Sequence, residues 1–221
     1  MTVGCVNIAA MTDTTLTSQA PTKRKNTRDK LLKAALSLVA EDRGGLAGLS
    51  LREITRRIGV SPTAFYRHFP GMEELGLTLI HESCEKLRTQ LAAVSSDGEM
   101  QARVHSTVEV FLTFVVEQRD VFVMIAREQA GSSKKMRAAI GHEIALTEQL
   151  LVQAWQERGL PDMPIEQLHR VVSMSISLAF STLPNVLDMN KNDSEGMAEL
   201  AAELEQQLAL LLLGAAALAG L

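Results

Sequence analysis

The chain has few of the residues that mark secreted or membrane-anchored proteins. Only two cysteines, Cys5 and Cys84, occur in 221 residues. We therefore expect no disulfide framework, and we expect the protein to work in the reducing cytoplasm. The late apolar run 208–221 is shorter than the roughly 20 residues that span a bilayer. Residues 1–22 lack the basic start and apolar stretch of a secretory signal. We interpret them as a disordered extension, and we expect no membrane association.

Residue groups that carry catalysis or hold metals are also scarce. His81 and Glu85 are the one good metal-capable pair on a common helix face, and no second cluster accompanies them. No glycine-rich loop follows a strand, and no strained turn presents a nucleophile. The sequence therefore predicts neither an enzyme nor a metal or cofactor site.

Charge is distributed unevenly along the chain. Residues 21–70 hold eleven lysines and arginines against four acidic residues, whereas the rest from position 71 holds eleven against twenty-one. The overall net charge of −4 therefore conceals a basic module on an acidic body. That asymmetry is typical of a protein whose N-terminal end meets phosphates, although a solvated basic face would look the same by charge alone.

Hydrophobic periodicity predicts an all-α protein. Apolar residues recur at helical spacing from residue 27 onward, and no stretch shows the alternation of a half-buried strand. Glycine, proline and polar breaks divide this pattern into helices expected over residues 26–41, 50–59, 61–69, 72–91, 99–117, 121–129, 133–158, 165–188 and 194–217.

Residues 50–69 have the pattern of a helix-turn-helix. Ser50 and Glu53 form a capping box that starts one short helix, Gly59 ends it, and Ser61 followed by Pro62 starts the next. Two short helices joined by a tight turn are the usual arrangement for reading the major groove.

The second of these helices carries the candidate base contacts. Phe65 and Phe69 lie four residues apart and are expected to pack on Ile54 and Ile58, which leaves the opposite face to DNA. Hydroxyl, methyl and guanidinium groups read base edges, while phenol and imidazole suit phosphates. The candidate DNA-contacting set from this helix is Ser61, Pro62, Thr63, Ala64, Tyr66, Arg67 and His68.

These motifs resemble the DNA-binding domain of the TetR family. The likeness covers about residues 26–75 and rests on Thr27 to Leu32, Leu49 to Ile54, Ile58 to Ser61 and Phe65 to Phe69. It implies that Thr27 and Arg52 join Tyr66 and His68 as phosphate contacts. Many members have a lysine two residues after the position of Pro70, where this chain has Met72, so that contact is not carried over.

A narrower similarity is to FabR/DesT-type regulators of unsaturated fatty-acid synthesis. It extends beyond the DNA-binding module to residues 127–132 and to Thr182, Leu183, Pro184 and Asp188. This resemblance implies a long-chain acyl-coenzyme A as effector. The residues that we expect to line an acyl tunnel are Phe111, Phe114, Val115, Phe122, Met124, Ile125, Met174, Leu178 and Phe180, and Arg127 is a further candidate effector contact.

Several of these sequence features have an alternative interpretation. The tunnel residues are also compatible with an ordinary core, and we favour a structural ion pair for Arg127 and Glu128 over a headgroup contact. The apolar helices over 168–187 and 200–218 predict a homodimer that reads palindromic operator DNA, although wholly internal helices in a monomer would have the same pattern.

The resulting prediction is an extension (1–22), a helix-turn-helix DNA-binding domain (23–70) and a helical domain for effector binding and dimerisation (71–221). The function expected is that of an effector-controlled transcriptional regulator, with the sign of the effector's action left open. The alternatives are a regulator of efflux or catabolic genes that responds to another hydrophobic ligand, and a helical lipid-binding protein that does not act on DNA.

Overall fold

The computed structural model of the chain describes residues 19–41, 45–94, 99–157, 163–190 and 193–219. Within this part every regular element is a helix, which confirms the all-α prediction. The elements are α1 (Gln19–Glu41), η1 (Leu46–Gly48), α2 (Leu51–Arg57), α3 (Pro62–Tyr66), α4 (Met72–Ala92), α5 (Met100–Glu117), α6 (Arg119–Gln129), α7 (Lys134–Glu157), α8 (Ile165–Ser181), α9 (Leu183–Asp188) and α10 (Ser194–Ala219).

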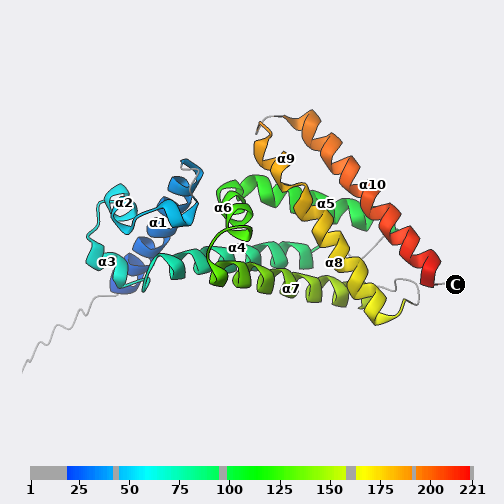
Figure 1. Cartoon of the computed structure of the whole chain (residues 1–221), viewed down its shortest axis with the longest axis horizontal. Helices are drawn as coiled ribbons and strands as arrows, with labels where there is room; N and C mark the ends of the chain where they lie inside the picture. The colour runs from blue at the N-terminus through cyan, green and yellow to red at the C-terminus, as the bar shows by residue number, and fades with distance from the viewer. Residues whose placement is uncertain (1–18, 42–44, 95–98, 158–162, 191–192, 220–221) are drawn as a thin grey trace, which may run out of the picture.

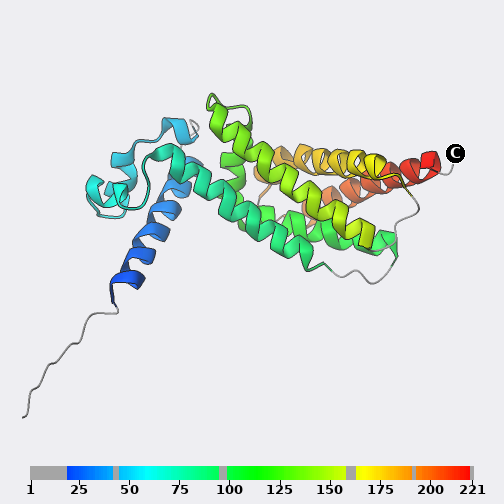
Figure 2. The same ribbon diagram turned by 90° about the horizontal axis from the view of Figure 1, so that it is seen from below.

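The helices form two parts of the molecule. The first three helices gather at one end, and α4 leads from them along α7 into a larger bundle that ends in α8 and α10 (Figures 1 and 2). Contacts between α1 and α6 and between α4 and α7 connect the two parts. One buried cluster, which includes Leu31, Phe65, Leu75, Met124 and Met136, runs through this junction. The N-terminal helices and the larger bundle therefore share one continuous hydrophobic core at their junction.

Two helix starts differ from those predicted, α3 ends at Tyr66 rather than at Phe69, and one short helix was not predicted. Helix α1 begins at Gln19, so residues 19–22 belong to it rather than to the expected extension, of which residues 1–18 lie outside the described part. Pro21 is compatible with this start because an amide in the first turn has no acceptor within the helix. Helix α6 begins at Arg119, because the break falls at Gln118 rather than at Arg119 and Asp120. The short helix η1 was not predicted.

The helix expected over 165–188 is interrupted at Thr182. Helix α8 ends at Ser181, and Pro184 lies in the first turn of α9. Proline cannot donate an amide to the preceding turn and clashes with its carbonyl, so it favours a new helix start. The hydroxyl of Thr182 donates to the carbonyl of Ala179 at 2.8 Å and helps to end α8.

By length and composition alone, the segments Ile165–Asp188 and Ser194–Leu218 are apolar enough to cross a membrane. This is weak evidence, because packing helices pass the same test. The first segment is broken into two helices, and both segments pack on the bundle: α8 contacts α7, and α10 contacts α5 and α8. Their exposed apolar residues need another explanation, which is given below.

Candidate DNA-binding surface and ligand cavity

Both starts of the helix-turn-helix have the caps that the sequence predicts. The hydroxyl of Ser50 accepts from the amide of Glu53 at 3.3 Å, and Glu53 Oε2 accepts from the amide of Ser50 at 2.8 Å. Ser61 caps α3 by accepting from the amide of Ala64 at 3.3 Å. Between the helices, Gly59 has a φ of 69°, a left-handed conformation that suits glycine. These local bonds fix how α3 leaves α2.

Helix α3 separates a buried face from an exposed one. Phe65 is fully buried and Phe69 nearly so, with ring centroids 5.7 Å apart, and both belong to the core that holds Ile54. Ile58 packs against the same core. The predicted hydrophobic face is confirmed. A short helix anchored by two aromatic rings can present its other side rigidly to a ligand.

The predicted DNA contacts lie on the accessible side of this module. Tyr66 is 61% exposed, and Ser61, Pro62, Thr63 and Arg67 are also exposed. Ala64 and His68 are half-buried. On neighbouring helices, Arg52 of α2 is exposed and Thr27 of α1 is half-buried. Their contacts with DNA stay predictions.

Two arginines of the basic module stabilise its packing instead. Arg57 Nη2 lies 2.7 Å from Glu41 Oε2 and joins α2 to α1. Arg28 Nη2 lies 2.5 Å from Glu82 Oε1 on α4, and its guanidinium sits 5.7 Å from the centroid of the Phe69 ring. The positive charge of residues 21–70 therefore serves packing as well as the candidate DNA surface.

Helix α6 holds the small module through two side chains that bind backbone. Arg127 Nη1 donates to the carbonyl of Val39 in α1 at 2.6 Å, and the amide of Leu46 in η1 donates to Glu128 Oε1 at 3.2 Å. Glu128 is 5% exposed. Gly45 lies so close that an added Cβ would sit 3.2 Å from Glu128 Oε1. Arg127 and Glu128 therefore have a structural role, as we favoured over a headgroup contact, and the partners shown here are backbone groups of the neighbouring module.

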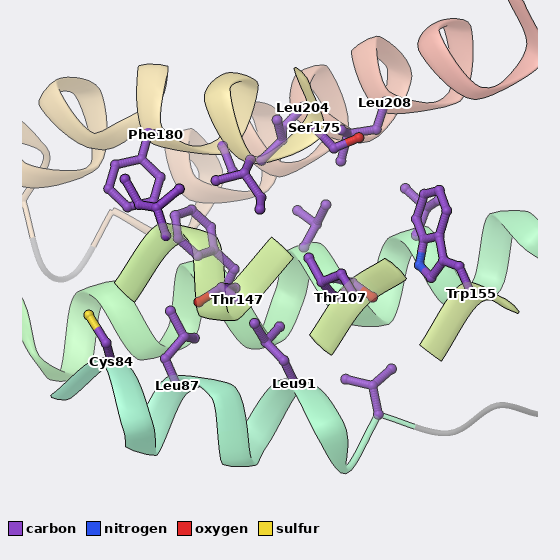
Figure 3. A pocket seen from close by; sticks show the side chains of 18 of the residues that line it. Cys84, Leu87, Leu91, Thr107, Thr147, Trp155, Ser175, Phe180, Leu204 and Leu208 are labelled. Carbon is purple, nitrogen blue, oxygen red and sulfur yellow. The ribbon is translucent and has the colours of Figure 1, made fainter. Parts of the chain in front are cut away.

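A largely apolar cavity of about 120 Å³ lies inside the bundle. Side chains from α4, α5, α6, α7, α8 and α10 line it. Figure 3 shows it as an elongated space, with Cys84 and Phe180 at one end and Trp155 at the other. The lining on α7 runs from Ile140 to Trp155, about 22 Å at 1.5 Å per helical residue. An elongated apolar ligand fits this shape better than a compact polar one.

The polar groups in the wall lie at particular places. Glu143 is 5% exposed, and its two oxygens are 2.9 Å from Nδ1 of His81 and 2.5 Å from Nη1 of Arg88 on α4. Burial raises the pKa of Glu143, but the hydrogen bonds with His81 and Arg88 outweigh it, so the pKa is lowered overall. Burial, with the nearby Glu143 charge, raises the pKa of Cys84 to about 12. The Cys84 side chain therefore stays a neutral thiol at neutral pH.

Four of the ten predicted effector-contacting residues, Phe111, Phe122, Ile125 and Phe180, line this cavity. The other six do not. Phe114, Val115 and Met124 are buried in the packed cores, Leu178 packs beside one of them, Met174 is 54% exposed, and Arg127 binds Val39. Helical periodicity identifies apolar faces but cannot tell which of them surrounds empty space.

Most of the residues that line the cavity were not predicted from the sequence. The α4 residues Cys84, Leu87 and Leu91 and the α7 residues Thr147, Leu151 and Trp155 all line the cavity. Their spacing of three or four residues places each set on one face of its helix. That periodicity was readable in the sequence, but only the tertiary fold shows that the two faces meet.

A helix-turn-helix in front of a helical bundle is the architecture of a transcriptional regulator that binds DNA. Residues 31–77 match the family model described as bacterial regulatory proteins of the tetR family. Residues 100–213 match the model described as the tetracyclin repressor-like C-terminal domain. The chain therefore belongs to the TetR family of DNA-binding transcriptional regulators.

Solved structures agree with this assignment. A tetR-family transcriptional regulator from Streptomyces coelicolor is similar, with 25% identity, a TM-score of 0.68, and coverage of 87% of this chain and 83% of that one. GusR of Salmonella enterica has 20% identity, a TM-score of 0.69, and coverage of 89% and 98%. The fatty acid degradation regulator FadR from Bacillus halodurans has 16% identity, a TM-score of 0.64, and coverage of 82% and 93%. The last two similarities show the fold alone.

Proposed function

We propose that the protein is a cytoplasmic, homodimeric repressor that binds palindromic operator DNA and is controlled by an elongated acyl effector. The effector class we propose is a long-chain acyl-coenzyme A or the related free fatty acid, and the targets are genes of lipid metabolism. The long apolar cavity, one wall of which is the helix that anchors the DNA-binding module, is the observation that carries this proposal.

The DNA-binding part of the proposal rests on α3. Arg67 and Thr63 are exposed near Tyr66, on the side away from buried Phe65. An arginine can form two hydrogen bonds with guanine, and a tyrosine hydroxyl can bind phosphate and fix the register. One copy of so short a helix reads few base pairs, and two copies about 34 Å apart read a palindrome.

The dimer part of the proposal explains the exposed apolar residues of the last helices. Met174 of α8 and Leu210, Leu213 and Leu218 of α10 are between 54% and 69% exposed. Both helices lie in the part of the molecule away from the DNA-binding module (Figure 1). Large exposed apolar side chains grouped on neighbouring helices favour a protein interface. A second copy of the chain would cover them and leave both α3 helices free for DNA.

Coupling between effector and DNA follows from α6. Phe122 and Ile125 line the cavity, while Arg127 and Glu128 of the same helix bind the backbone of α1 and η1. A ligand that displaces Phe122 or Ile125 therefore acts on α6, the helix that anchors the DNA-binding module. The effector shifts operator affinity only if it binds the two arrangements with different affinity.

Binding experiments test the proposal in two steps. Hexadecanoyl-coenzyme A and hexadecanoate are titrated into the protein by calorimetry, and a duplex selected from a random pool is then bound with and without each ligand. The proposal predicts saturable binding near one ligand per protomer and a change in duplex affinity of at least about tenfold. Binding of the duplex without any response to acyl ligands would favour a regulator of efflux or catabolic genes that takes another hydrophobic effector.

A further inference from the structure

The cavity has opposite charges at its two ends. Arg103 and Glu143 are the two residues with a full charge among the described side chains that line it. Arg103 lies in the first turn of α5, and Glu143 lies three residues after Ile140 in α7. The rest of the wall is mainly aliphatic and aromatic. A wall of this kind distinguishes one end of a long ligand from the other.

The helix register places these charges far apart. Along α4 the lining runs from Cys84 to Leu91, with Phe180 across the cavity at the Cys84 end and Trp155 beyond Leu91 (Figure 3). Glu143 contacts His81 and Arg88 of α4, which lie on either side of Cys84 in that helix, so it belongs to the Cys84 end.

Arg103 belongs to the Trp155 end. Along α5, Arg103 lies eight residues before Phe111, a distance of about 12 Å along the helix axis. Phe111 is near α6, because its ring centroid is 6.4 Å from that of Phe122. Helix α5 begins at Met100, a lining residue that follows α4 closely in the chain, and Leu91 lines the cavity near the end of α4. The start of α5 and the end of α4 therefore form the same end of the cavity.

We propose that the cavity binds an elongated anionic amphiphile in one direction, with its anionic head at Arg103 and its apolar tail against Phe122 and Ile125 of α6. This inference rests on the proposed acyl effector and adds its orientation. Arg103 already makes an interaction within the protein, and a guanidinium, with five N–H donors, can bind more than one acceptor at a time. At the other end, Glu143 and Arg88 balance each other's charge in an ion pair, so that end has no excess positive charge to attract an anion.

The orientation has a consequence for regulation. A tail that points toward Cys84 ends beside α6, so only a chain long enough to reach Phe122 and Ile125 contacts the helix that carries Arg127 and Glu128. The length of the ligand would then decide whether it changes DNA binding, whereas the head at Arg103 would decide whether it binds. The affinity for the ligand and the change in DNA binding that the ligand causes would therefore depend on different parts of the ligand.

The head position is tested with Arg103→Gln and a pair of matched ligands. Hexadecanoate and hexadecanol share a tail and differ in charge. We expect Arg103→Gln to weaken hexadecanoate binding by about tenfold or more and hexadecanol binding by less than about twofold, because a charge-assisted bond is lost only with the anion. Lys86→Gln, which removes the same charge from an exposed position of α4, is the control. An equal effect on both ligands, or none, overturns the head position.

The two anionic sources are distinguished in the same series. Hexadecanoyl-coenzyme A has phosphates in place of a free carboxylate. If it binds more tightly than hexadecanoate and loses more affinity in Arg103→Gln, the head at Arg103 is the coenzyme A phosphate group; the reverse identifies a free fatty acid. Both results support an anionic head at this end.

The tail position is tested on the unmodified protein, so folding of a variant is not at issue. A hexadecanoate with a photoreactive diazirine at its terminal carbon is bound and irradiated, and the adducts are mapped by mass spectrometry. Adducts at Phe122, Ile125 or Cys84 support the orientation. Adducts at Trp155, Leu151 or Met100 reverse it while leaving the acyl effector in place. No saturable labelling would remove the acyl effector, and this inference with it.

Discussion

The amide of Leu46 donates a hydrogen bond to Glu128 Oε1 at 3.2 Å, and this bond joins the DNA-binding module to the helix that borders the cavity. Leu46 is 6% exposed and Glu128 is 5% exposed, so water does not readily replace either partner. The side chain of Leu46 also meets α4, where an added Cβ on Gly76 would lie 2.3 Å from Leu46 Cδ2. This contact makes η1 a junction between α4 and α6.

Removal of the Glu128 carboxylate should loosen this junction. Glu128→Ala leaves the buried amide of Leu46 without its acceptor, and we expect the free energy of unfolding to fall by about 1–3 kcal/mol. Glu128→Gln keeps a carbonyl oxygen that can accept the bond and should lose less. Denaturant unfolding measures both, with the exposed Glu117→Ala as control. Equal losses in the Ala and Gln variants would show that this hydrogen bond does not hold the module.

Arg67 should contribute sequence discrimination. A two-bond contact between arginine and guanine is worth about 1–3 kcal/mol, so Arg67→Ala should weaken binding to the selected duplex by about tenfold to a hundredfold and relax one base position. Arg52→Ala should instead weaken binding to all duplexes and reduce the salt dependence by about one phosphate contact.

The control for both variants is Arg57→Ala, because the Arg57 charge is already paired with Glu41 within the module. Fluorescence anisotropy at several salt concentrations measures the three variants. If Arg57→Ala changes the salt dependence as much as Arg52→Ala does, the assignment of phosphate contacts is wrong.

Filling the cavity should abolish the effector response without abolishing DNA binding. Thr147 points into the cavity in Figure 3. Thr147→Phe adds a ring to that space, so we expect hexadecanoate binding to weaken by at least about tenfold, since overpacking costs about 1–3 kcal/mol where space is short. Operator affinity should then be the same with and without ligand. Gln149→Phe, on an exposed position of the same helix, is the matched control and should bind ligand normally.

The pair formed by His105 of α5 and Glu205 of α10 should make stability depend on pH. Nδ1 of His105 lies 2.8 Å from Glu205 Oε1, and this hydrogen bond, together with the Glu205 charge, raises the pKa of His105 above 6.5. Stabilisation is therefore complete below about pH 6.5, the pKa of the unfolded chain, and is lost as the pH rises through the higher folded pKa.

Thermal unfolding of the unmodified protein and of His105→Gln tests this dependence between about pH 5 and pH 8. We expect the unmodified protein to have the higher Tm in the acidic part of the range, with the difference shrinking as the pH rises. A Tm difference that grows with pH would contradict the assignment.

The DNA-binding module was largely predictable from the sequence because its signals are local. The capping box of Ser50 and Glu53, the turn at Gly59 and the cap at Ser61 each involve residues within three positions of one another. The burial of Phe65 and Phe69 follows from their spacing of four residues. Local chemistry of this kind needs no knowledge of the rest of the fold.

The cavity and the α6 anchor were predictable only in part because they depend on distant residues. Arg127 binds a carbonyl 88 residues away and Glu128 an amide 82 residues away, and both acceptor and donor belong to the backbone. No side-chain pattern marks such partners. Met174 looked like a lining residue because it lies in an apolar helix, but its side chain is exposed on the outside of the chain.

Control of DNA binding through the cavity is tested by selecting duplexes from a random pool with the protein, with and without hexadecanoyl-coenzyme A, and sequencing them. We expect enrichment of a palindrome whose half-sites lie about one helical turn, or a multiple of it, apart. We also expect the ligand to change retention of that palindrome by the unmodified protein but not by Thr147→Phe. Enrichment of no palindrome, or a ligand effect that persists in Thr147→Phe, would contradict control of DNA binding through this cavity.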